Sequence, residues 1–177
     1  MKVFKKIILV MFFSLIGSTL YAQEEKETFL QLSLFNPVQI FNDSYNVGGV
    51  RINLLYGSNN NMSGLDLGLI NKVKWDYHGG YQGGMVNFVG NDFNGWQDGL
   101  VNITRKNLIG LQTGVYNENL SLKGVQYGLV NITEKFSGLQ LGLLNYTQVF
   151  SGVQLGVLNI SSRRYPIRFF PIVNVNF

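Results

Sequence analysis

The chain contains 177 residues, which is enough for one domain with one sizeable hydrophobic core. It contains no cysteine, so disulfides, thiolate metal ligands and cysteine nucleophiles are excluded. The formal net charge is +4, but three of the 14 basic residues are lysines within the first six residues. The remaining 11 basic residues face 10 acidic ones, so the charge gives no reason to expect a nucleic-acid partner. With a single histidine, the chain has little material for metal or acid–base chemistry, and we expect no cofactor and no enzymatic activity.

The first segment has the features of an export signal. Lys2, Lys5 and Lys6 precede an apolar run over residues 7–16, and small residues lead from there to Ala22. This order predicts a secretory signal peptide over residues 1–22 and a single β-repeat domain over residues 23–177. The alternative is an uncleaved anchor, but the run is shorter than the about 20 residues that span a bilayer. We therefore expect an exported protein.

The rest of the chain repeats one eight-residue motif. Two weaker copies occupy residues 29–36 and 49–56, and the final residues 168–177 form one further extended segment. Counting that segment gives ten units. The seven clear copies, which begin 14 to 16 residues apart, are GLDLGLIN (64–71), GYQGGMVN (80–87), GWQDGLVN (95–102), GLQTGVYN (110–117), GVQYGLVN (124–131), GLQLGLLN (138–145) and GVQLGVLN (152–159).

Each copy alternates between two kinds of side chain. Numbered from its first residue, the motif carries aliphatic or aromatic residues at positions two and six and a variable residue at position four, with Gly, Gln and Gly typical of positions one, three and five. An apolar residue recurs two positions before the motif, as in Phe93, Leu108 and Phe136. Alternation with a period of two over ten or more residues predicts a β-strand, with positions three and five facing inward.

Two all-β architectures could use this repeat. A parallel β-solenoid would stack identical residues, and the recurrent Asn131, Asn145 and Asn159 would suit its corners. An antiparallel meander would suit the near-palindromic order of the motif, because reversing alternate strands still puts Gln beside Gln. The segments between motifs are short and polar, which argues against a second strand in each coil. We favour a meander that closes into a barrel of about ten strands and so removes its unpaired edges.

A barrel of this repeat would fit an outer membrane. Ten tilted residues rise about 25 Å, which matches the hydrocarbon band, and positions two, four and six would face lipid. The closing alternation from Phe169 to Phe177 is typical of the last strand of such barrels. Trp75, Tyr77, Tyr81 and Trp96 would belong to an interfacial aromatic girdle. Asp98 is the clearest misfit on the lipid side.

The succession SGLDLGLIN, the repeated G-[LV]-Q-x-G-[LV]-x-N and the closing FFPIVNVNF together resemble the bacterial surface repeat-containing proteins of the leptospiral type. The resemblance covers residues 29–177. It implies a secreted, cell-surface or outer-membrane protein without an assigned enzymatic role, and we expect a structural, surface-interaction or minor-pore role for it. A secreted soluble β-repeat module that binds a partner is the alternative.

Position three defines a polar belt inside the predicted barrel. Two neighbouring copies carry a charge there instead of glutamine, which predicts an inward-facing ion pair between Arg51 and Asp66. Such a belt would line a narrow lumen or fill it. This lumen belt comprises Gln31, Arg51, Asp66, Gln82, Gln97, Gln112, Gln126, Gln140 and Gln154.

Most basic residues of the domain lie in alternate connections, which a barrel with periplasmic termini would place on its outer side. A basic outer rim would attract lipopolysaccharide phosphates or acidic surface glycans, in addition to the membrane lipid itself. This basic rim comprises Lys72, Lys74, Arg105, Lys106, Lys135, Arg163 and Arg164.

Overall fold

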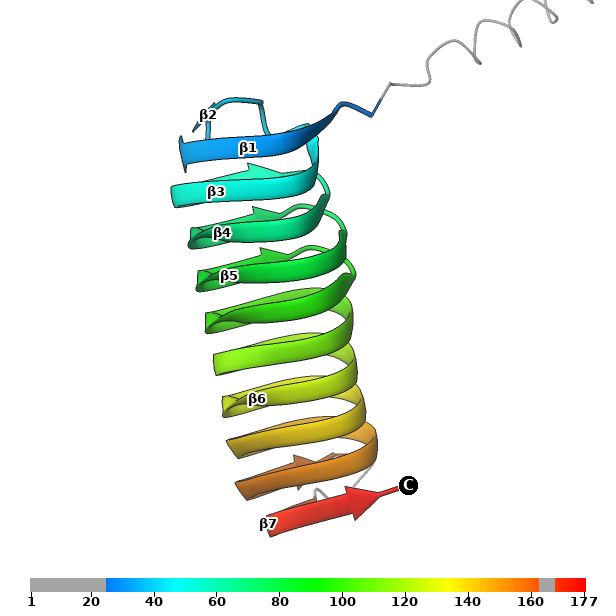
Figure 1. Cartoon of the computed structure of the whole chain (residues 1–177). Helices are drawn as coiled ribbons and strands as arrows, with labels where there is room; N and C mark the ends of the chain where they lie inside the picture. The colour runs from blue at the N-terminus through cyan, green and yellow to red at the C-terminus, as the bar shows by residue number, and fades with distance from the viewer. Residues whose placement is uncertain (1–24, 163–167) are drawn as a thin grey trace, which may run out of the picture.

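The computed structural model describes residues 25–162 and 168–177, and its secondary structure is entirely β. Figure 1 shows the chain wound into a stack of similar coils, with the N-terminal coil at one end and the C-terminal strand at the other. The fold is a β-solenoid. Its elements are β1 (Glu27–Phe35), β2 (Val38–Gln39), β3 (Asn46–Asn59), β4 (Met62–Val73), β5 (Tyr77–Val89), β6 (Phe93–Ser161) and β7 (Arg168–Asn176).

Successive motif copies pair in parallel and in register. Gly49 pairs with Gly64, and Arg51 pairs with Asp66. Gln82 pairs with Gln97 in the same way, so each motif position lies directly above the same position of the previous copy. One copy with its connecting residues is therefore one coil, and β6 is a single continuous extended segment that winds through several coils.

The predicted antiparallel barrel is wrong, because β1, β3, β4, β5 and β6 are neighbours through parallel pairing. The palindromic motif satisfies its inward and outward environments in either direction, so it carried no information about strand direction. The expectation that the connecting segments are too short and polar for a second strand in each coil is also wrong. Residues 102–104 and their equivalents continue as extended chain and form the returning side of each coil.

The alternation breaks at two corners of the coil. At the first, the glycine at motif position one has a positive φ, as in Gly95 (φ 130°) and Gly110 (φ 129°). A Cβ on Gly95 would lie 2.1 Å from the carbonyl oxygen of Gly80 in the coil before it. At the second corner, positions six and seven both face outward, as Leu69 and Ile70 do, and the asparagine at position eight turns inward.

Apolar residues form one stack inside the coil. The apolar residue two positions before the motif is buried in most coils, which agrees with its predicted inward orientation, whereas before Gly80 the buried residue is Tyr77, three positions away. Tyr77 and Phe93 of neighbouring coils pack with ring centroids 4.7 Å apart. This apolar core consists of Val47, Met62, Tyr77, Phe93, Leu108, Leu122, Phe136 and Phe150, together with Val73 and Val89 from the returning side.

Antiparallel strands cover both ends of the solenoid. At the N-terminal end β2 pairs with β1, and the amide of Gln31 exchanges two hydrogen bonds with the backbone of Phe41. At the C-terminal end β7 pairs antiparallel with the last part of β6. The closing alternation therefore forms a terminal strand as expected, but that strand covers the last coil instead of closing a barrel. Both strands occupy edges that would otherwise offer unpaired backbone groups.

The predicted signal peptide lies outside the described residues, as do Arg163 and Arg164 of the basic rim. The part of the chain that the structure describes contains no helix long and apolar enough to cross a membrane.

Candidate functional site

The lumen belt is a stack of buried side chains inside the solenoid. All nine of its members have 0% exposure, and without a barrel there is no barrel lumen for them to line. From Gln97 to Gln154, each glutamine donates from Nε2 to the Oε1 of the glutamine one coil earlier, at 2.7–2.8 Å. A parallel stack makes this possible, because identical amides then have identical orientations in every coil.

The glutamine stack ends on the buried ion pair. Gln82 donates to Asp66 at 2.9 Å, and Asp66 accepts from the guanidinium of Arg51 at 2.8 and 2.6 Å. The remaining Arg51 donor reaches the carbonyl oxygen of Lys72 and the side chain of Asn59. The predicted contact between Arg51 and Asp66 is thus present. Its groups are well supplied with partners, as a buried pair requires.

A second polar stack escaped the sequence analysis. The asparagine at motif position eight donates to the Oδ1 of the next asparagine, from Asn71 to Asn159, at 2.8–2.9 Å. It also donates to a backbone carbonyl of the following coil, as Asn102 does to Thr113 at 2.7 Å. The two stacks donate in opposite directions along the solenoid, so their amide dipoles oppose each other. The recurrence of asparagine in the sequence was the available signal.

Tyr77 belongs to the apolar core and feels the charges of the ion pair. Its hydroxyl is 2.7 Å from the carbonyl oxygen of Gly64 and 2.8 Å from that of Tyr81. Burial raises the pKa of Tyr77, and the negative charge of Asp66 raises it further. Tyr77 is therefore a core residue and not part of an aromatic girdle. Among the described residues, no three His, Cys, Asp or Glu side chains gather as metal ligands.

The basic rim does not form an outer rim of a barrel. Its described members project from the returning side and the turns of the coils, where acidic residues also lie. Lys74 pairs with Asp43 at 2.8 Å, and Arg105 approaches Glu118 at 3.8 Å. These contacts offset two of the positive charges, whereas Lys106 and Lys135 are exposed.

One outward surface of the solenoid is mostly apolar along its whole length. We call it the apolar face and define it as motif positions two, four and six of the nine copies, 27 positions in all. Leu100, Leu129 and Leu143 are typical members, and each is about half exposed. Val173 and Val175 of β7 extend it over the last coil. With a strand spacing of about 4.8 Å and a rise of about 3.3 Å per residue, the face covers about 900 Å².

The centre of the apolar face holds the one polar cluster on it. The hydroxyls of Tyr81 and Thr113 both donate to the carboxylate of Asp98, and the indole of Trp96 donates to Thr113 at 3.0 Å. Tyr81 lies flat over Gly83, where a Cβ would be 2.6 Å from its ring. Burial and the neighbouring Asp98 raise the pKa of the Tyr81 hydroxyl. Asp98 stood out in the sequence, but only the stacking showed its partners.

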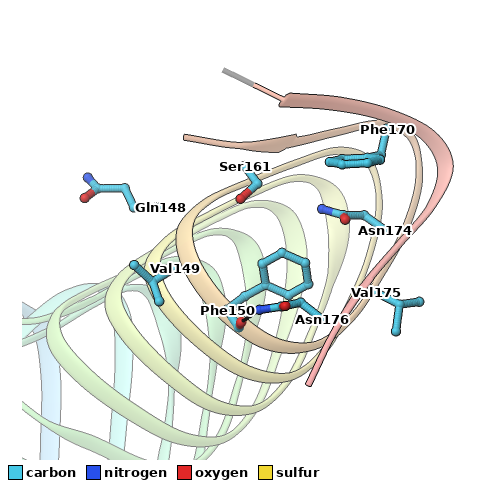
Figure 2. A pocket seen from close by; sticks show the side chains of 8 residues that line it. All are labelled: Gln148, Val149, Phe150, Ser161, Phe170, Asn174, Val175 and Asn176. Atoms are coloured by element: carbon cyan, nitrogen blue, oxygen red, sulfur yellow. Dashed lines mark hydrogen bonds between the residues drawn. The ribbon is translucent and has the colours of Figure 1, made fainter. Parts of the chain in front are cut away.

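A hollow of ≈ 270 Å³ lies at the C-terminal end of the solenoid. Figure 2 shows Phe150, Asn174 and Asn176 around the end of the last coil, where the side chain of Asn176 donates to the carbonyl oxygen of Phe150. The residues lining this hollow are Gln148, Val149, Phe150, Ser161, Phe170, Asn174, Val175 and Asn176. The described residues among its lining include no acid, base or cysteine, so these eight side chains form no catalytic constellation.

Comparison with known proteins adds no assignment, since no family profile, curated protein or solved structure matches the chain.

Proposed function

We propose that this protein is an exported, non-catalytic β-repeat module of a bacterial cell surface, which binds a macromolecular partner through its apolar face. The signal peptide predicted over residues 1–22 and the resemblance of residues 29–177 to surface repeat-containing proteins support the location. The observation that carries the binding role is the apolar face itself. Of its 27 outward positions, only Asp98 is charged.

The size of the face supports a binding role. The largest apolar patch of a typical soluble monomer covers about 300–600 Å², and a standard protein interface buries about 800 Å² of each partner. The face covers about 900 Å². It is therefore larger than the largest apolar patch of a typical monomer and as large as one side of a standard interface. The interior does not require these residues to be apolar, because the coil is already filled by its own core and its two amide stacks.

The basic rim supports a second role less well. Binding of lipopolysaccharide or acidic glycans remains a prediction for Lys72, Lys106 and Lys135. Acidic groups already neutralise Lys74 and Arg105 in part. A pore is not part of the proposal, because the inward side chains of the described coils are buried.

Fractionation of cells that express the full chain tests the proposal. We expect the wild-type protein to sediment with the cell envelope. A variant with Leu100→Ser, Leu129→Ser and Leu143→Ser should move to the soluble fraction, because the three leucines, 49–55% exposed, lie on the apolar face.

The matched control replaces three apolar residues of comparable exposure elsewhere on the coil. Ile109→Ser, Leu120→Ser and Val149→Ser change side chains that are 40–51% exposed, and this variant should stay with the envelope. Circular dichroism must show that both variants keep their β structure. Equal distribution of the wild type and the two variants would reject the apolar face as the binding surface.

A further inference from the structure

The position of Asp98 restricts what can cover the apolar face. Asp98 lies in the fifth of nine motif copies and at the middle one of the three outward positions, so it marks the centre of the face. Each of its carboxylate oxygens accepts one hydrogen bond, from Tyr81 or from Thr113. A carboxylate has about four acceptor sites, so two remain for a group that approaches from outside.

A lipid surface is a poor match for this arrangement. Insertion of the face into hydrocarbon would bury the carboxylate at its centre. Removing a charged group from water into the bilayer core costs much free energy. Surfaces that bind anionic lipids carry Lys and Arg beside their apolar residues. Here Lys72, Lys74 and Arg105 lie on the returning side of the coil, away from positions two, four and six.

A second copy of the chain is also a poor match. Two copies that cover each other's whole apolar face about a two-fold axis bring the two centres together. The two Asp98 carboxylates would then oppose each other in a desolvated interface, and like charges in contact disfavour association. The face lacks a cation of its own to place between them, since Asp98 is its only charged residue.

We infer that the apolar face binds a different protein, whose apolar surface carries a Lys or Arg side chain opposite Asp98. Tyr81 and Thr113 hold the carboxylate in place, and the neighbouring Trp96 offers an aromatic surface beside it, which suits a guanidinium or ammonium group. The inference rests on the proposed function, and it adds the chemical character of the partner.

Two designed peptides test the inference. Both are amphipathic helices with a leucine stripe, and they differ only at the centre of the stripe, where one carries arginine and the other glutamine. The chain has two tryptophans, so Trp75→Phe leaves Trp96 as the single fluorescent reporter in the cluster. We expect the arginine peptide to bind about tenfold more tightly than the glutamine peptide, because it alone pairs with the carboxylate.

Asp98→Asn should remove this preference while the glutamine peptide keeps its affinity. The matched control is Glu134→Gln, an exposed acid on the returning side, which should leave the preference intact. Equal affinity of the two peptides for the parent protein would overturn the inference and leave the proposed function standing. Binding of neither peptide, or equal binding by the leucine-to-serine variant, would instead count against the apolar face itself.

Two further measurements test the two other possible occupants of the apolar face, which are a second copy of the chain and a lipid surface. Sedimentation of the purified protein should give a monomer, and flotation with phosphatidylcholine vesicles should leave it unbound. A dimer that the leucine-to-serine variant abolishes would overturn the inference in favour of a second copy. Flotation that depends on the same leucines would overturn it in favour of lipid.

Discussion

Arg51 and Asp66 replace two glutamines of the interior stack with a fully buried ion pair. Asp66 accepts hydrogen bonds from Gln82 on one side and from Arg51 on the other. The aligned amides of the glutamine stack therefore end on a carboxylate whose charge Arg51 neutralises. In a repeat of nearly identical coils, a shift of one coil would leave most contacts unchanged. This pair occurs in one place, and it therefore distinguishes the correct pairing of β3 with β4 from a shifted one.

Removing one partner of this pair should cost much more than removing both. Asp66→Asn leaves the Arg51 guanidinium buried without its counter-charge, and we expect unfolding to become easier by about 3–5 kcal/mol. The double variant Arg51→Gln, Asp66→Gln restores the glutamine stack and should lose about 1 kcal/mol or less. Urea unfolding followed by circular dichroism measures both. A double variant as unstable as Asp66→Asn would contradict this account.

The middle of the glutamine stack should be sensitive to loss of a single amide. Gln112 donates to Gln97 and accepts from Gln126 and Asn119. Gln112→Met keeps the volume but leaves buried donors unpaired, so we expect a loss of at least about 2 kcal/mol. Gln148→Met, at an exposed position, should change the unfolding free energy by about 0.5 kcal/mol or less. Similar urea midpoints for the two variants would show that the stack contributes little.

Two glycines with positive φ should respond differently to alanine. At Gly95 a Cβ would lie 2.1 Å from a backbone oxygen of the previous coil, so Gly95→Ala combines backbone strain with a clash. We expect a loss of about 2–5 kcal/mol. At Gly79 (φ 83°) nothing lies within 4 Å of a Cβ, so Gly79→Ala should cost only the strain, about 1–2 kcal/mol. Thermal unfolding compares them, and equal losses would reject close coil contact at Gly95.

Alkaline pH should destabilise the fold through Tyr77. Its pKa in the folded protein is raised by burial and by Asp66, so the unfolded chain loses this proton first as the pH rises. The stabilisation that comes from the raised pKa of Tyr77 is present in full below about pH 10, the ordinary pKa of tyrosine, and decreases above it. Urea midpoints between pH 8 and 11 should therefore fall more steeply for wild type than for Tyr77→Phe.

Tyr116 supplies a comparison for this pH dependence. Its hydrogen bond to Glu118, with a smaller contribution from burial, raises the pKa of Tyr116 to about 12. This pair lies nearer the surface, so Tyr116→Phe should alter the alkaline slope less than Tyr77→Phe does. The reverse order of slopes would argue against Tyr77 as the main alkaline-sensitive group.

Much of the candidate site could be predicted from the sequence, because its geometry is local. Alternation along one strand already separates inward from outward side chains, and this separation does not depend on the direction of the neighbouring strand. Gln112 and its equivalents were therefore expected inside and Leu129 outside, and both expectations hold. Arg51 and Asp66 were expected to meet because they occupy the same position of adjacent copies, and either strand direction brings them together.

The direction of pairing needed the tertiary structure. The motif is almost the same when reversed, so alternation alone does not distinguish an antiparallel barrel from a parallel solenoid. The distinction depends on the corners, where Gly95 takes a positive φ and Asn102 donates to a carbonyl of the next coil. These are properties of the backbone path, and a hydrophobic pattern does not contain them.

The sequence by itself thus determined an all-β chain of repeated strands, the inward orientation of the side chain at motif position three, and the partnership of Arg51 with Asp66. The tertiary structure decided that the strands stack in parallel as coils. Parallel stacking aligns the amides into two continuous stacks and gathers Tyr81, Trp96, Asp98 and Thr113 from three successive coils. An antiparallel meander would pair only the central position of one motif copy with the same position of the next, whereas parallel coils place every motif position beside its equivalent 14 to 16 residues away.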